Sequence, residues 1–201
     1  MKAVKLVVVN IEKCSGILER PERFSSVMRL HKCASFKNPA VRMQGYAAEL
    51  ALSYALSGGE LLPPVYRYEK SGKPVVDGGF ISLSHSGGHG VCAYSSVPVG
   101  VDIEECREVS PAAARRILTP KELCEYSDGG GSGFLLERFV IKEAFFKLTG
   151  EGVFGGMDRV FERDGQVFRD GVRRGFAHRF GEGFIGYAVT PEPCELLIEY
   201  V

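Results

Sequence analysis

The chain has 201 residues, a length that fits one domain or two small halves packed together and is enough for a buried core. Lysine plus arginine and aspartate plus glutamate balance at 25 each, so the overall charge gives no reason to expect a nucleic acid or an anionic membrane as partner. The longest apolar run near the start, residues 6–9, predicts a buried strand, because it is far too short for a signal-peptide core or a membrane span.

Residues 38–59 predict the first long helix. Asn38 can cap its start, Pro39 fits the first helical position, and Gly58 and Gly59 stop it. Four short segments rich in β-branched and aromatic residues follow, divided by glycine, proline and serine. We predict a meander of strands over residues 63–76, 78–88, 89–96 and 97–105.

The second half repeats this order of helix and then strands. Residues 110–127 and 132–150 predict helices, and residues 127–133, SDGGGSG, have the composition of a flexible loop that either faces a partner or is a tolerated insertion. Strands are predicted over residues 159–169, 183–190 and 194–201, the first of these as a hairpin around Asp164 and Gly165. A weak echo between residues 92–104 and 186–199 supports duplication, since both run strand, turn with proline, strand, acid.

The cysteines follow no metal-binding or disulfide pattern. None forms a C-x-x-C pair, and no histidine lies at zinc-finger spacing. Reduced thiols predict a cytoplasmic protein. The cysteines are Cys14, Cys33, Cys92, Cys106, Cys124 and Cys194.

A cluster of carboxylates follows the apolar run at residues 97–101. In a strand alternate residues share a face, so Gly100, Asp102 and Glu104 point one way and Glu105 points the other, toward solvent. Two carboxylates in one space repel each other unless a cation lies between them, and magnesium or manganese suits such oxygen ligands. The alternative is a solvated strand end.

The helix over residues 132–150 places an acid and a lysine on a core-facing stripe. Leu136, Val140, Glu143 and Lys147 follow helical spacing, so the charged pair continues the apolar face. This pair is either an ordinary i,i+4 ion pair or a third metal ligand with a phosphate-binding lysine one turn on. Lys142, about 100° around the helix from Glu143, could serve either way.

A serine- and glycine-rich turn follows the strand that ends near His85. Backbone amides, the hydroxyls of Ser84 and Ser86, and the His85 ring could hold a phosphate there, whereas the alternative for His85 is a structural role. Lys73 lies in the turn SGKP and by composition is only an exposed lysine.

Four motifs occur in a fixed order: GKP at residues 72–74, SLSHSG at 82–87, GVDIE at 100–104 and KEAFFKLTGEG at 142–152. Together they resemble the signature series of the phosphopantetheinyl transferases, specifically the longer pseudo-dimeric class typified by the surfactin-synthetase activator. The resemblance covers roughly residues 40–155.

The resemblance implies an α+β fold of two similar halves, residues 1–101 and 102–201. Each half would have a helix packed on a small antiparallel sheet, and the active site would lie in the cleft between them. A single chain would already supply both sides of this cleft, so we expect a monomer. In the family a tryptophan usually stands where this chain has Phe139, and we expect the ring to keep its packing without the N–H donor.

The activity implied by the resemblance is transfer of the phosphopantetheine arm of coenzyme A to a serine of an acyl or peptidyl carrier protein, with release of adenosine 3',5'-bisphosphate. By similarity, Asp102, Glu104 and Glu143 would ligate Mg²⁺, with Mn²⁺ as a possible substitute. Glu143, or a water that it holds, would act as the base, and Lys147 would neutralise the pyrophosphate.

The coenzyme A phosphates would be held, by similarity, by Lys73, Ser84 and His85. Arg42, at the start of the first long helix, is the candidate contact from the N-terminal region. Two other classes of function stay open: a non-catalytic module of the same fold that binds coenzyme A or a carrier protein, and an unrelated magnesium-dependent phosphohydrolase. The sequence does not rank the possible carrier proteins, nor does it decide whether acylated coenzyme A is accepted.

Overall fold

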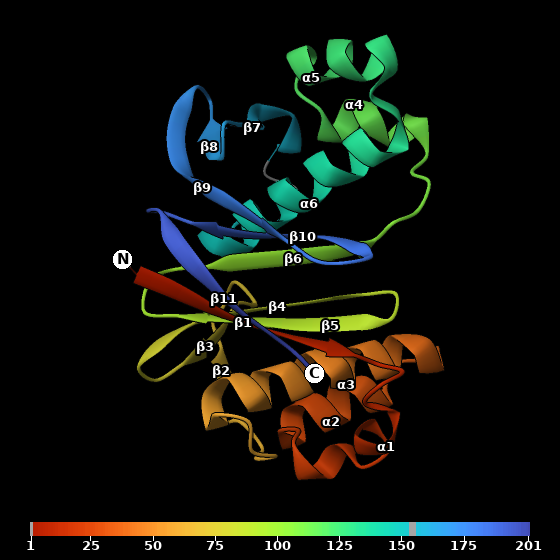
Figure 1. Cartoon of the computed structure of the whole chain (residues 1–201), viewed down its shortest axis with the longest axis vertical. Helices are drawn as coiled ribbons and strands as arrows, with labels where there is room; N and C mark the ends of the chain where they lie inside the picture. The colour runs from red at the N-terminus through yellow and green to blue at the C-terminus, as the bar shows by residue number, and fades with distance from the viewer. Residues whose placement is uncertain (1, 153–155) are drawn as a thin grey trace.

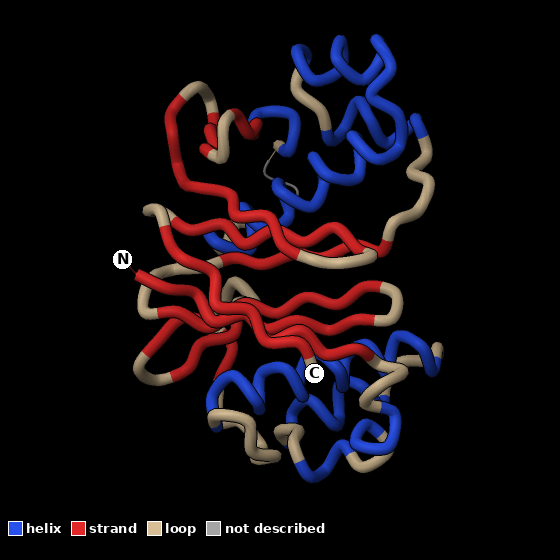
Figure 2. Tube along the Cα trace, in the orientation of Figure 1, coloured by secondary structure: helices blue, strands red, loops and turns tan. Residues whose placement is uncertain are grey.

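Two β-sheets pack face to face, and a long helix covers the outer side of each (Figures 1 and 2). The structure, a computed structural model, describes residues 2–152 and 156–201. From bottom to top in Figure 1 the layers are helix α3, the first sheet, the second sheet and helix α6. The predicted α+β class is confirmed.

The first sheet has the strand order β11-β1-β5-β4-β3-β2, and the second has the order β6-β10-β9-β8-β7. The strands of the first sheet are β1 (Lys2–Asn10), β2 (Arg67–Tyr68), β3 (Pro74–Val76), β4 (Gly79–Ser86), β5 (His89–Ser95) and β11 (Cys194–Tyr200). Those of the second are β6 (Gly100–Glu105), β7 (Val160–Arg163), β8 (Gln166–Arg169), β9 (Val172–Phe180) and β10 (Phe184–Thr190). All pairs are antiparallel except β1 with β11, so the expectation of two purely antiparallel sheets is wrong for the first sheet.

The helices are α1 (Ser15–Leu18), α2 (Val27–Ala34), α3 (Pro39–Ser57), α4 (Ala114–Ile117), α5 (Pro120–Glu125) and α6 (Gly131–Thr149). Helix α3 begins and ends as predicted: the Asn38 side chain accepts a hydrogen bond from the Ala40 amide, and Gly58 closes the helix with a left-handed φ of 74°. The sequence did not predict α1, α2 or β9, whose segments are short or interrupted by arginine and glycine.

The glycine-rich residues 127–133 do not form the predicted free loop. Tyr126–Gly130 make a wide helical turn that leads directly into α6. Gly129 and Gly131 adopt φ values of 117° and 63°, and the Ser127 hydroxyl donates to the Leu123 carbonyl at 2.9 Å. Glycine permits these backbone angles, which is why a loop-like composition is compatible with a helical connection here.

Three apolar clusters hold the layers together. Val8 and Ile103 belong to the cluster between the two sheets, Leu50 and Ile81 to the cluster under α3, and Phe145 to the cluster under α6; each is almost completely buried. Among the described residues, no helix is both long and apolar enough to cross a bilayer. All six cysteines are free thiols, and the cytoplasmic location inferred from them stays a prediction.

Strand β6 crosses the predicted boundary and pairs in the second sheet, and β11, the last strand of the second half, pairs in the first sheet. Strand β6 follows β5 but pairs with β10, and β11 follows β10 but pairs with β1. The boundary at residues 101 and 102 stays a prediction. The two segments that echo each other in the sequence, residues 92–104 and 186–199, are the two segments that make this exchange.

Gly100 allows α6 to lie directly against β6. A Cβ atom at this position would stand 2.0 Å from the Ala144 carbonyl oxygen and 2.3 Å from the Leu148 amide nitrogen, both backbone atoms of α6. Backbone cannot move aside as a flexible side chain can, so the contact needs a residue without Cβ. The space that the missing side chain of Gly100 leaves is therefore filled by the backbone of α6.

We predict that Gly100→Val lowers the free energy of unfolding by about 3 kcal/mol or more, because it forces α6 away from β6. The control is Gly133→Ala, since no atom lies within 4 Å of a Cβ atom at Gly133. It should leave stability unchanged or raise it by roughly 0.5–1 kcal/mol. Urea unfolding of the two variants tests this, and equal midpoints would show that the close contact does not constrain the fold.

Candidate functional site

A cavity of about 550 Å³ opens where β4, β6 and the C-terminal end of α6 meet. Helix α2 and the turn between β2 and β3 complete its walls, so the chain on both sides of residue 101 contributes to it. Most candidate site residues named from the sequence line this cavity, whereas Arg42, Ser86 and Lys142 do not. These lining candidates are Lys73, Ser84, His85, Asp102, Glu104, Glu143 and Lys147.

One wall of the cavity is acidic. Asp102 is only 6% exposed, which rules out a solvated strand end, and Glu143 faces it from α6. Burial raises the pKa of Glu143 to about 7, the negative charge of Asp102 adds to this effect, and the positive charge of Lys147 opposes it. Burial and the charge of Asp102 therefore favour the protonated form of Glu143.

Hydrogen bonds fix the orientation of the β6 carboxylates. Asp102 Oδ1 accepts from the Ser84 hydroxyl at 2.6 Å and from Lys147 Nζ at 2.7 Å. Lys147 also donates to the Leu83 carbonyl at 3.2 Å. Glu104 Oε2 accepts from the Ser86 hydroxyl at 2.6 Å. Ser84, which the sequence suggested for phosphate binding, thus directs its hydroxyl proton toward Asp102.

The acidic wall matches magnesium in the chemistry of its donors. Carboxylate oxygens are hard ligands, and Mg²⁺ is commonly bound through one or two carboxylates plus waters and substrate phosphates. Across residues 2–152 and 156–201, however, no three acidic, histidine or cysteine side chains already converge closely enough to hold an ion by themselves. A metal here would take part of its ligands from water or from a phosphate.

Four basic side chains, here called the basic wall, also line the cavity. Arg29 and Lys32 reach the cavity from α2, Lys73 from the turn before β3 and His85 from β4. Lys73 Nζ donates to the carbonyl of Leu148 at 2.8 Å, and burial lowers the pKa of Lys73. Burial also lowers the pKa of His85, with further lowering by the charges of Lys147 and Arg29, so the neutral ring is favoured.

The sequence reasoning missed Arg29 and Lys32 and chose Arg42 in their place. Arg42 does not line the cavity; its guanidinium donates to the Phe36 carbonyl at 3.0 Å. The choice of Arg42 is therefore not supported, because its guanidinium is bonded to the segment just before α3 and lies outside the cavity lining. A usable signal was present: Ser26 caps α2, the helix that presents Arg29 and Lys32.

A fully buried glutamate orients Arg29. Glu49 is 0% exposed, and its Oε2 accepts from Arg29 Nε at 3.0 Å. The Ser26 amide and the Tyr66 hydroxyl also donate to the Glu49 carboxylate, at 3.1 Å and 3.0 Å. An acid in the middle of an apolar helix needs such partners, and here they fix the position of a cavity-lining arginine.

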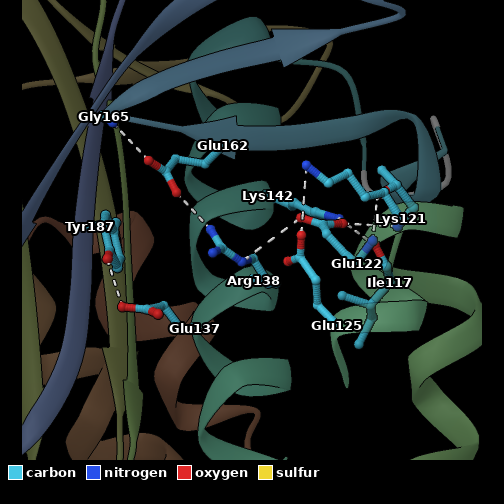
Figure 3. Close-up of polar contacts among 11 residues, drawn as sticks. Ile117, Lys121, Glu122, Glu125, Glu137, Arg138, Lys142, Glu162, Gly165 and Tyr187 are labelled. Carbon is cyan, nitrogen blue, oxygen red and sulfur yellow. Dashed lines mark hydrogen bonds and ion pairs between the residues drawn. The ribbon is translucent and has the colours of Figure 1, made fainter. Parts of the chain in front are cut away.

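Lys142, whose role the sequence left open, lies outside the cavity. Its Nζ donates to Glu122 Oε2 at 2.6 Å and to the Ile117 carbonyl at 2.7 Å, and the residue is 1% exposed (Figure 3). Arg138, on the same helix, pairs with Glu162 on the neighbouring strand. Lys142 therefore ties α6 to α5 as a buried ion pair, and removing one partner would leave an uncompensated charge.

A family model described as the 4'-phosphopantetheinyl transferase superfamily matches residues 98–181. The 4'-phosphopantetheinyl transferase psf-1 of Bacillus pumilus is 35% identical over 112 residues, which are 51% of this chain and 48% of that protein. The 4'-phosphopantetheinyl transferase Sfp of Bacillus subtilis (strain 168) is 28% identical over 127 residues, covering 59% of this chain and 55% of the relative. The chain thus spans about half the length of these curated relatives.

A holo-[acyl-carrier-protein] synthase of Neisseria meningitidis is 37% identical over 67 residues, 29% of this chain and 54% of that protein. The solved holo-[acyl-carrier-protein] synthase of Thermotoga maritima matches 48% of this chain and 63% of its own, at 27% identity and a TM-score of 0.39, a likeness too low to support an argument. The matched residues 98–181 include β6 and α6, the elements that provide Asp102, Glu104, Glu143 and Lys147. Residues 98–181 of this chain thus resemble the 4'-phosphopantetheinyl transferase superfamily.

Proposed function

We propose that this protein transfers the phosphopantetheine arm of coenzyme A to a serine of an acyl or peptidyl carrier protein and releases adenosine 3',5'-bisphosphate. The observation that carries the proposal is that an acidic and a basic wall share one cavity in a chain whose residues 98–181 match this superfamily. Such a cavity suits attack by a hydroxyl on a pyrophosphate, which needs a proton acceptor, a cation and phosphate clamps.

The acidic wall would hold Mg²⁺ through Asp102, Glu104 and Glu143, and Mn²⁺ suits the same oxygen donors. A bound ion would supply positive charge against the negative charge that grows on the pyrophosphate. Glu143, or a water that it holds, takes the proton from the carrier serine as the new oxygen–phosphorus bond forms.

Lys147 and the basic wall together would bind the leaving group. Lys147 lies one helical turn from Glu143 and neutralises the pyrophosphate as the phosphoanhydride bond breaks and the electron pair stays on adenosine bisphosphate. Lys73 and His85, with Arg29 and Lys32 from α2, hold the coenzyme A phosphates. The walls come from one chain, so we propose that a monomer is sufficient.

The central test is the intact mass of an apo acyl or peptidyl carrier protein after incubation with this protein, coenzyme A and magnesium. We expect a gain equal to one phosphopantetheine arm, and no gain when EDTA is present. Coenzyme A binding by calorimetry without transfer to any of several carriers would instead indicate a non-catalytic module. Absence of both transfer and binding would overturn the proposal.

We predict that Glu143→Gln lowers the transfer rate by about 10²- to 10⁴-fold, because the substitution removes the carboxylate without changing the side-chain volume. Glu125→Gln is the matched control, since Glu125 lies exposed on α5 outside the cavity. Both variants should melt at the wild-type temperature. Wild-type turnover by Glu143→Gln would remove Glu143 from both of its proposed roles.

We predict that Lys32→Met raises the KM for coenzyme A by about tenfold and leaves kcat nearly unchanged, because it removes one charged contact to a phosphate. Arg42→Lys should change neither constant, since Arg42 lies outside the cavity lining. Steady-state kinetics at saturating carrier protein separate the two variants. The opposite result, with Arg42 and not Lys32 controlling KM, would restore the sequence-based choice.

A further inference from the structure

Alternate residues of β4 direct three hydroxyls toward β6. Ser82, Ser84 and Ser86 share one side of the strand, while Ile81 and Leu83 pack against the cluster under α3 on the other side. Strand β4 belongs to the first sheet and β6 to the second, so no ladder of backbone hydrogen bonds joins them. The three serines therefore lie at the junction between the sheets.

Strand β6 is the edge strand of its sheet, and amides on the side away from β10 need partners because an unpaired buried N–H is unfavourable. The serine hydroxyl oxygens accept hydrogen bonds from these amides, and in each bond the amide lies nineteen residues after the serine. The bonds run from Val101 N to Ser82 Oγ (3.0 Å), from Ile103 N to Ser84 Oγ (3.4 Å) and from Glu105 N to Ser86 Oγ (3.1 Å). The hydroxyls thus replace a neighbouring strand along this edge.

An amide that donates to a hydroxyl oxygen leaves the hydroxyl proton free to be donated elsewhere. Ser84 donates its proton to Asp102 Oδ1 and Ser86 donates to Glu104 Oε2, both at 2.6 Å, a distance typical of bonds to a charged carboxylate. Ser82 also accepts a hydrogen bond from an amide of β6, but within the described residues it makes no hydrogen bond to a carboxylate.

We propose that Ser84 and Ser86 are positioning residues that orient Asp102 and Glu104 for the bound cation. Each hydroxyl holds one carboxylate oxygen, while Asp102 Oδ2 and Glu104 Oε1 make no hydrogen bond to any residue in 2–152 or 156–201 and can serve as ligands. Partners of this kind fix the rotamer of a ligand and typically change metal affinity by roughly 10- to 100-fold. This proposal rests on the proposed function and gives the serines a role that differs from phosphate binding.

The test is the affinity for Mn²⁺, measured by electron paramagnetic resonance of free Mn²⁺ in titrations of the full chain with coenzyme A present. We expect Ser84→Ala and Ser86→Ala to bind Mn²⁺ at least about tenfold more weakly than wild type. Ser82→Ala is the matched control: it loses the same kind of amide contact but no carboxylate contact, so its affinity should stay within about twofold of wild type. Ser86→Thr, which keeps the hydroxyl, should retain affinity.

Thermal unfolding of all variants separates positioning from a structural role. If the serines only joined the sheets, the three alanine variants would lose stability and Mn²⁺ affinity together, and that result would overturn the proposal. Wild-type affinity in Ser84→Ala and Ser86→Ala would overturn it while leaving the metal site in place. If wild type bound no Mn²⁺, both this proposal and the proposed metal ligands would fail. If Ser84→Ala does not fold, the Mn²⁺ affinity of Ser86→Ala tests the proposal by itself, because Ser86 lies at the end of the strand.

Discussion

The structure depends on the way in which β6 is held on all its sides. Its amides pair with serine hydroxyls of β4 along the sheet edge, Val101 and Ile103 are buried between the sheets, and Gly100 lies against the backbone of α6. A strand held in this way has no freedom to shift its register, because a one-residue slip would turn the apolar residues toward α6 and the acids into the core. The positions of Asp102 and Glu104 follow from this register.

The cavity brings three carboxylates close together, an arrangement that does not by itself stabilise a fold. Glu143 faces two other acids, and its pKa is raised because burial and like charge both disfavour its ionised form. The nearby cations are directed elsewhere in part: Arg29 toward Glu49 and Lys73 toward the end of α6. Buried ionisable groups with shifted pKa values are typical of functional sites.

The two walls come from different parts of the chain. The family model matches residues 98–181 and so covers the acidic wall, whereas the basic wall comes from α2, from the turn before β3 and from β4, all before residue 98. The family match therefore covers the proposed metal ligands but not the basic wall. In the part of the chain before residue 98, the Glu49 network orients Arg29.

The sequence by itself determined the local features. Caps and glycines marked the ends of α3, the positive φ values of Asp164 and Gly165 follow from the Asp-Gly hairpin signal, and alternation along β6 placed Asp102 and Glu104 on one face. Tertiary structure decided whatever depends on which segments meet. Composition alone could not show that β11 pairs with β1, that Lys142 meets Glu122 instead of the cavity, or that α2 supplies Arg29 and Lys32 in place of Arg42. Local sequence encodes backbone angles and the face of a side chain, but the partner across a junction is fixed only by long-range packing.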